Sequence, residues 1–304
     1  MNVMPYASVA VVAVGSSWGL YWLPLRELEA VAAIGPWATL AVTLVAAVAL
    51  APVAWLRRDH LRAAGRPGLA SVALGGASFV LYSNGLLYGH VAVVILLFYL
   101  TPVWSTLIAR FWLGWRISWW RYAALVLGLG GIALVLRASS GELPLPYRLG
   151  DWLGLASGLA WSIASTGIHL HSRTAPLETN FVFCAGAVVG ALVLALLLGW
   201  GEWPVLAPDV YVATAGWVVL IGLVWWAVLL TLFVGATQQL EPARVGILLL
   251  SEALVGALSA ALLTDEPFGA LMAAGMVLVL AAGAVESLPE RRRDHTPLTQ
   301  NPQR

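Results

Sequence analysis

Long, nearly uninterrupted apolar stretches constrain this chain more than any other feature. Ten of them, each long enough to cross a bilayer, follow one another along 304 residues. A spanning helix needs about 20 apolar residues, so ten spans occupy most of the chain. Backbone groups in lipid must pair within a helix or a closed barrel, and runs without strict alternation favour helices. The sequence therefore predicts an all-α polytopic membrane protein.

The expected spans are separated by short breaks that contain Arg, Gly and Pro. Only 10% of the residues are charged, whereas a soluble protein carries roughly a quarter. No positively charged segment precedes the first stretch, which is therefore expected to be retained as a span. The approximate limits are 5–25, 36–56, 69–89, 91–113, 119–136, 151–170, 179–200, 211–236, 243–263 and 268–285.

Arginine placement predicts the orientation. If the N-terminus is cytoplasmic, 13 of the 16 arginines fall on the cytoplasmic side, where short loops concentrate basic residues. Both termini are therefore expected inside the cell. The absence of lysine and the richness in Ala, Gly, Val and Leu are typical of a GC-rich bacterial genome, so we expect a protein of the bacterial inner membrane.

The second half of the chain echoes the first. Trp18 in the first span corresponds to Trp161 in the sixth, and Thr101 in the fourth to Glu252 in the ninth. Five spans in each half would give the halves opposite orientations, as in many transporters. The predicted organisation is a first five-helix repeat at 1–138, a periplasmic linker at 139–150, a second repeat at 151–286 and a disordered cytoplasmic tail at 287–304.

Three short features carry a resemblance to a known family. They are Trp18 followed by Gly19, Pro102 in the fourth span, and the pair Asp265 and Glu266 after the ninth. With the span count, the chain resembles the drug/metabolite transporter superfamily over residues 5–286, in its ten-span, EamA-type branch. The resemblance implies two inverted five-helix repeats and transport of small metabolites.

Aromatic content narrows this resemblance. Sixteen tryptophans make the chain look most like the bacterial exporters of aromatic amino acids. The chain departs from the family pattern at Trp115, where a Glu is usual, and at Ala253, where the second repeat often has Pro. Residue roles known for the family therefore do not transfer directly to these two positions.

Glu252 is the one acidic residue expected in the interior of a span. A charge at that depth costs at least about 2.5 to 3.5 kcal/mol on insertion scales, so such a group is a functional candidate. Gly256 and Ser259 follow it at helical spacing, which gives a small, polar face. Glu252 could contact a substrate amine or carry a coupling proton; alternatively, it fixes its helix against a neighbour.

Further candidates come from aromatic and hydroxyl side chains on predicted spans. Large rings between small residues could stack on a substrate or fill the core. Pro102 removes one helical hydrogen bond and is a candidate hinge, or else a static bend. The expected substrate-binding set is Tyr82, Tyr99, Thr101, Trp161, Ser165, Ser251 and Glu252, with Pro102 as the hinge.

Other function classes find little support. Five scattered histidines and one cysteine offer no metal-ligand spacing, no phosphate-binding loop precedes a basic residue, and a net charge of +1 predicts no nucleic-acid footprint. We expect no cofactor, metal or partner protein, and a secondary transporter that exports amino acids, chiefly aromatic ones, by alternating access. Efflux of cationic lipophilic drugs, a membrane-embedded enzyme acting on lipid-linked substrates, and a non-transporting scaffold remain the alternatives.

Overall fold

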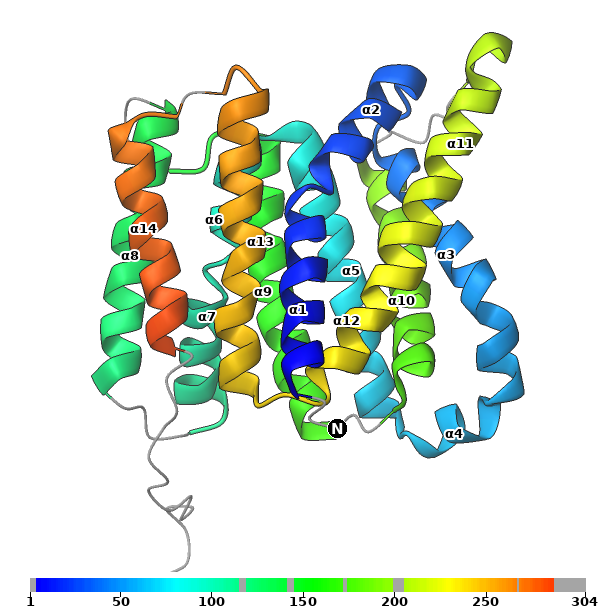
Figure 1. The fold of residues 1–304 in the computed structure, drawn as a ribbon, viewed down its shortest axis with the longest axis horizontal. Helices are drawn as coiled ribbons and strands as arrows, with labels where there is room; N and C mark the ends of the chain where they lie inside the picture. The colour runs from blue at the N-terminus through cyan, green and yellow to red at the C-terminus, as the bar shows by residue number, and fades with distance from the viewer. Residues whose placement is uncertain are drawn as a thin grey trace, which may run out of the picture.

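The computed structural model describes residues 4–114, 119–140, 145–171, 174–198, 205–266 and 268–286. These residues form helices and connecting turns, with no strand among them (Figure 1). The predicted all-α fold is therefore confirmed. The expected tail at 287–304, Trp115 and part of the linker at 139–150 lie outside the described residues.

The helices follow the expected spans closely. In the first half they are α1 Met4–Gly19, α2 Trp22–Ala32, α3 Pro36–Leu56, α4 Arg58–Ala63, α5 Arg66–Tyr88, α6 Val91–Phe98, α7 Thr101–Leu107 with the π-helical turn Ile108–Trp112, and α8 Trp119–Ser140. In the second half they are α9 Leu149–His171, α10 Pro176–Leu198, α11 Tyr211–Ile221, the π-helical segment Gly222–Leu229, α12 Leu230–Thr237, α13 Pro242–Leu263 and α14 Ala270–Glu286.

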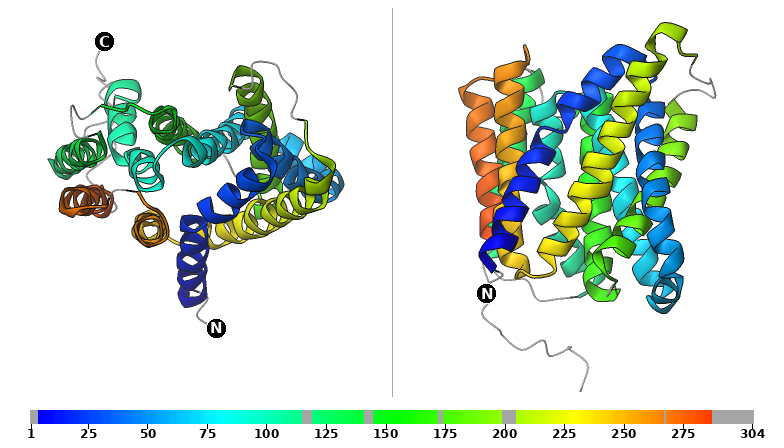
Figure 2. Two further views of the ribbon diagram at one scale, coloured as in Figure 1. Left: turned by 90° about the horizontal axis from the view of Figure 1, so that it is seen from above. Right: turned by 45° about the vertical axis from the view of Figure 1, so that its right-hand side comes forward.

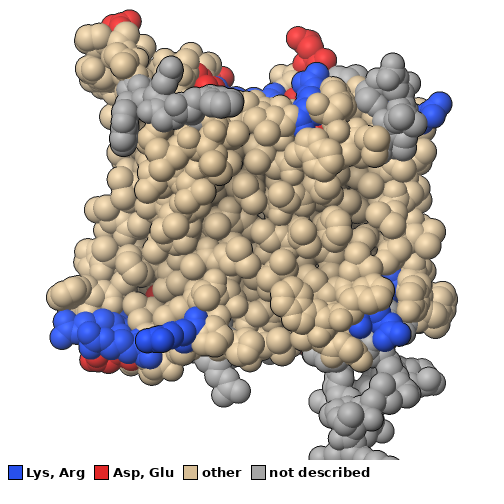
Figure 3. Space-filling view, turned by 180° about the vertical axis from the view of Figure 1, so that it is seen from behind, with Lys and Arg blue, Asp and Glu red and all other residues tan. Residues whose placement is uncertain are grey.

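Eight helical segments in the described residues are long and apolar enough to cross a membrane. Helices α9 and α14 run between the same two ends of the bundle (Figure 1). We call the end that carries α2 and the α5–α6 turn the upper end, and the end that carries α4 the lower end. Charged side chains gather at these two ends, and an uncharged belt lies between them (Figure 3). The chain is therefore a multi-pass membrane protein.

The first span differs most from expectation. It was predicted to end at residue 25, but after a break at Leu20 and Tyr21 the helix resumes and continues to Ala32. Arg26 therefore stands on a helix rather than in a loop. Its guanidinium donates hydrogen bonds to the carbonyl oxygens of Leu86 and Gly89. These bonds let the charged side chain be accommodated on a helix at the end of the bundle.

The fourth expected span is broken where the sequence places proline. Helix α6 ends at Phe98 and α7 begins at Thr101. Pro102 has no N–H to give the carbonyl of Phe98, and the hydroxyl of Thr101 donates to that carbonyl instead, at 2.8 Å. The helix is thus interrupted just before Pro102, and the freed acceptor is satisfied locally.

Small residues set several of the helix contacts. Gly154 and Gly158 of α9 face the backbone of α6 at Val94 and Phe98, as expected for a packing motif. Helices α8 and α14 pack on each other at one edge of the bundle (Figure 2). Between α5 and α3, Asn84 Nδ2 donates a hydrogen bond to Thr39 Oγ1 at 2.8 Å.

Candidate functional site

A cavity of about 880 Å³ opens at the lower end of the bundle. Exposed residues of its rim include His169 and Gln238, together with the partly buried Arg121. Its walls come from α5, α7, α8, α9, α10, α12 and α13. Cavities of about 300 to 1,000 Å³ are typical of sites for small molecules.

Aromatic rings form the deep wall of this cavity. Phe79 of α5, Trp161 of α9 and Phe183 of α10 all line it. The ring of Phe79 lies edge-on to the other two, with centroids 5.3 Å from Trp161 and 5.2 Å from Phe183. Such edge-to-face packing holds the rings in place while it leaves one face of the cluster toward the cavity.

Two of the predicted site residues reach the cavity directly. Trp161 and Ser165 are about one turn apart on α9, and both belong to the lining. Ser165 Oγ donates to the carbonyl of Ser162 at 3.2 Å. Its hydroxyl oxygen therefore still has acceptor capacity toward the cavity.

Three other predicted residues form one hydrogen-bonded group, which we call the central cluster: Tyr82, Tyr99 and Glu252. Tyr82 donates to Glu252 Oε1 at 3.4 Å and Tyr99 approaches Oε2 at 3.2 Å. Tyr99 also donates to the carbonyl of Leu249 at 2.6 Å. Glu252 is buried, and Leu249, one turn earlier on α13, lines the cavity. The central cluster therefore lies directly behind the cavity wall.

The remaining predicted residues lie apart from both groups. Thr101 is part of the helix break, where its carbonyl accepts from Ser162 Oγ at 3.3 Å. Ser251 faces α1 instead, where its hydroxyl lies 3.5 Å from the carbonyl of Val12. The Thr101 carbonyl and the Ser251 hydroxyl thus take part in contacts between helices in this structure.

Two cross-helix ion pairs were not anticipated from the sequence. Arg57 pairs with the buried Glu178 at 3.4 Å at the lower end, and Arg26 pairs with Glu266 at 3.0 Å at the upper end. Each residue stands at or just beyond the edge of an expected span, where charges are ordinary. The only sequence signal was Glu266, noted as a family landmark rather than as a site.

No group of three or more His, Cys, Asp or Glu side chains that could hold a metal is found within the described ranges. The polar groups of the cavity wall and of the central cluster are hydroxyls, one carboxyl and backbone carbonyls, and Arg121, His169 and Gln238 add polar groups at the cavity rim. This arrangement is suited to binding an amphipathic solute between rings and hydroxyls.

Comparisons with known proteins bear on the fold and on the first half of the chain. No curated protein sequence matches the chain. Fourteen chains of solved structures match. One, described only as a crystal structure of a protein, has 20% identity and a TM-score of 0.58, with 91% of this chain and 96% of its own covered. The likeness shows that the fold extends over nearly the whole chain.

A family model matches the first half of the chain. The match covers residues 6–137, from the start of α1 almost to the end of α8, and its description is the EamA-like transporter family. The chain therefore carries, over residues 6–137, a domain of the EamA-like transporter family of the drug/metabolite transporter superfamily, whose members are membrane transporters of small solutes.

Proposed function

We propose that this protein is a ten-span secondary transporter of the bacterial inner membrane that exports amino acids, aromatic ones foremost, by alternating access. The observation that carries the proposal is the cavity of about 880 Å³, which has an aromatic wall and whose lining reaches the lower end of the bundle at His169 and Gln238. The lower end, where α1 begins and α14 ends, is the cytoplasmic side in this proposal. A substrate would enter the cavity from there.

Equivalent contacts on α8 and α14 support two inverted repeats. A Cβ atom on Gly131 would lie 2.8 Å from the carbonyl oxygen of Gly275, and one on Gly275 would lie 2.6 Å from that of Gly131. The backbone nitrogens of Val279 and Val135 take matching places on the two sides, at 2.9 and 3.0 Å. Such reciprocity is what a two-fold axis between repeats produces.

The chemistry of the lining favours amino acids over lipophilic cations. None of the described residues that line the cavity is acidic, and Arg121 stands at its rim. The buried carboxyl of Glu252 is behind the wall and faces two phenols. Rings at the deep end match an aromatic side chain, and Ser165 and Thr166 offer hydroxyls to polar groups.

The proposed hinge is the helix break at Tyr99 and Leu100. Pro102 maintains this break, because it has no N–H to complete the helical hydrogen bond to Phe98. Helix α6 above the break packs against α9, while the segment below it lines the cavity. Pro102→Ala should allow a continuous helix and slow turnover more than it changes affinity. Unchanged turnover would leave Pro102 as a static bend.

Flux in proteoliposomes tests the proposal. We expect radiolabelled phenylalanine, tyrosine or tryptophan to move faster than alanine, and a cationic dye to move least, with and without a pH gradient. Preferred transport of the dye would support the drug-efflux alternative. No flux of any amino acid or dye would favour the remaining alternatives, an enzyme acting on lipid-linked substrates or a non-transporting scaffold.

A further inference from the structure

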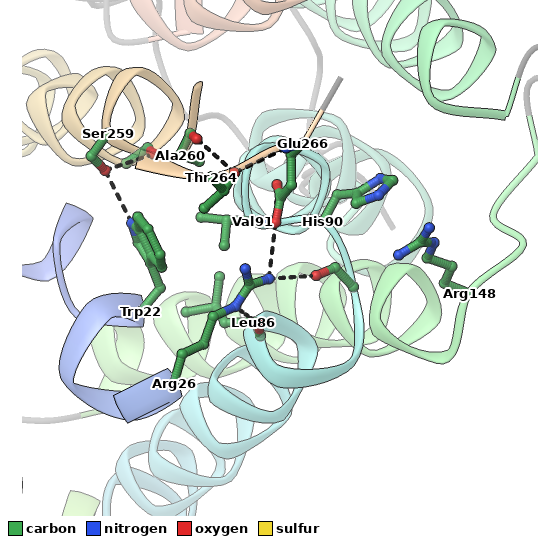
Figure 4. Close-up of polar contacts among 12 residues, drawn as sticks. Trp22, Arg26, Leu86, His90, Val91, Arg148, Ser259, Ala260, Thr264 and Glu266 are labelled. Carbon is green, nitrogen blue, oxygen red and sulfur yellow. Dashed lines mark hydrogen bonds and ion pairs between the residues drawn. The ribbon is translucent and has the colours of Figure 1, made fainter. Parts of the chain in front are cut away.

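Arg26 and Glu266 meet at the upper end, on segments that are far apart in the sequence. Arg26 projects from α2, and Glu266 from the turn between α13 and α14 (Figure 4). The nitrogen Nη2 of Arg26 is 3.0 Å from Oε1 of Glu266. The pair thus joins α2, near the start of the chain, to the second half of the protein.

Both charges are also bonded to the ends of helices. Arg26 donates to the carbonyl oxygens of Leu86 and Gly89 at the C-terminal end of α5, at 3.1 and 2.9 Å. Glu266 Oε2 accepts from the backbone N–H of Val91, the first residue of α6, at 2.8 Å. A cation at a helix C-terminus and an anion at a helix N-terminus are each favoured by the helix dipole. Each charge therefore faces the helix end that stabilises it.

The surroundings hold the pair together without burying it. The Arg26 guanidinium lies 5.5 Å from the centre of the Trp22 ring, and Trp22 Nε1 donates to Ser259 Oγ of α13 at 3.0 Å. His90 brings no further charge near neutral pH, because burial and then the charge of Arg148 lower its pKa. The side chains of Arg26 and Glu266 are 30% and 13% exposed. Water can therefore solvate the two charged groups when they separate, which lowers the cost of breaking the pair.

We propose that Arg26 and Glu266 form the closing contact of the upper end and must separate before that end can open. They are positioning residues of the transport cycle, since they touch helix ends and not the cavity. The inference rests on the proposed alternating access. It assigns this role to Glu266 and not to Asp265, its exposed neighbour.

The test measures how fast a buried position below the pair becomes accessible. Ser259 is buried and lies on α13, five residues before Thr264 at the end of that helix, or about 7 to 8 Å deeper by helical rise. A Ser259→Cys reporter is placed in a Cys184→Ala background, which removes the native thiol. The full-length protein in lipid nanodiscs is then treated with a water-soluble maleimide, which reaches both ends.

Arg26→Gln and Glu266→Gln should each speed labelling about 5- to 30-fold, the factor that corresponds to one or two kcal/mol. The double variant should be labelled no faster than the faster single variant, because both remove one interaction. The matched controls are Arg148→Gln and Asp265→Asn, which remove upper-end charges outside the pair. Both should keep the parental rate.

Equal labelling of the parent and both pair variants would overturn the inference, as would equal acceleration by the controls. Arg26→Lys guards against misfolding, since it keeps the charge but cannot reproduce the guanidinium fork; an intermediate rate is expected. The labelling needs no substrate. If labelling is accelerated but no amino-acid flux is found, only the proposed function is contradicted. If flux is normal but labelling is unchanged, only the closing contact is contradicted.

Discussion

The two ends of the bundle are built differently. At the upper end α5 and α9 touch through their backbones, at Gly89 and Gly150, and the Arg26–Glu266 pair bridges α2 to the α13–α14 turn. At the lower end the helices spread around the cavity. Under the proposed alternating access, the upper end is closed by direct backbone contact reinforced by charges at helix ends, whereas the lower end leaves a cavity between its helices.

Each end has an ion pair, but the two pairs do different things. Arg57 and Glu178 join the end of α3 to the start of α10, two helices that remain packed together while the cavity is open. Arg26 and Glu266 join segments across the α5–α6 turn. An ion pair at the end of the bundle is therefore not by itself a closing contact. In the proposed cycle, only a pair that joins segments which must move apart can have that role.

The largest expected effect is at the backbone contact of the upper end. A Cβ on Gly150 would meet the backbone nitrogen and Cα of Gly89, which cannot yield as a side chain can. Gly150→Ala should lower the free energy of unfolding by about 3 kcal/mol, the upper range for overpacking. Thermal unfolding in detergent measures it.

Gly235 on α12 is the matched control at the lower end. Its Cβ would have Pro176 as its nearest neighbour, at an ordinary 3.5 Å. Gly235→Ala should be neutral or stabilise by up to about 1 kcal/mol through helix propensity. Similar losses at the two positions would contradict the contrast between a tightly packed upper end and a spread lower end.

Truncating the rings near the lower cavity should come next in size. Trp161→Ala should weaken binding of an aromatic amino acid by about 1 to 3 kcal/mol, because it removes buried apolar surface. Tyr82→Ala and Tyr99→Ala, behind the wall, should have smaller effects. Affinity for alanine should fall less in all three variants. Equal losses for both substrates would make the rings part of the core rather than of recognition.

The smallest effect on stability is expected between the two ends, in the central cluster. Glu252→Gln retains the shape of the side chain and can still bond Tyr82 and Tyr99, so unfolding should change by no more than about 1 kcal/mol. Because Glu252 is behind the wall, we expect substrate binding to survive and gradient-driven flux to fall.

Flux and binding across pH 5 to 8 separate the alternatives for Glu252, since the range surrounds the usual carboxyl and imidazole titrations. Weaker binding with an unchanged pH response would instead make Glu252 a contact for the substrate amine. Flux like that of the unaltered protein throughout the range would leave it only a packing role.

Sequence periodicity predicted much of the fold because each span is a local property. The limits of α3 were predicted to the residue, and the break before Pro102 follows from a missing N–H. The extension of the first helix to Ala32 was missed, since Arg26 and Glu29 resemble the end of a span. Their charges are tolerated because other groups bond them: Arg26 reaches the distant carbonyls of α5, and Glu29 accepts from the N–H of Gly35 in the turn after its own helix.

For the candidate site, too, the sequence identified individual residues but not which of them lie together. A lone acid in an apolar run identified Glu252, and ring size identified Tyr82, Tyr99 and Trp161, but spacing along one helix cannot say which helices become neighbours. The structure gathers Glu252 with the two tyrosines and leaves Ser251, its immediate neighbour in sequence, facing α1. A helix turns by about 100° per residue, so adjacent residues reach different partners.

By itself, the sequence determined that this is an all-helical membrane protein, where most spans begin and end, and which polar groups are costly enough to need partners. Hydrophobicity and missing backbone donors act within a single helix, so they can be read without its neighbours. Only the tertiary structure decided that the cavity opens at the lower end and that Arg26 meets Glu266 across the upper end. Both depend on contacts between segments far apart in the chain, and no local pattern specifies those.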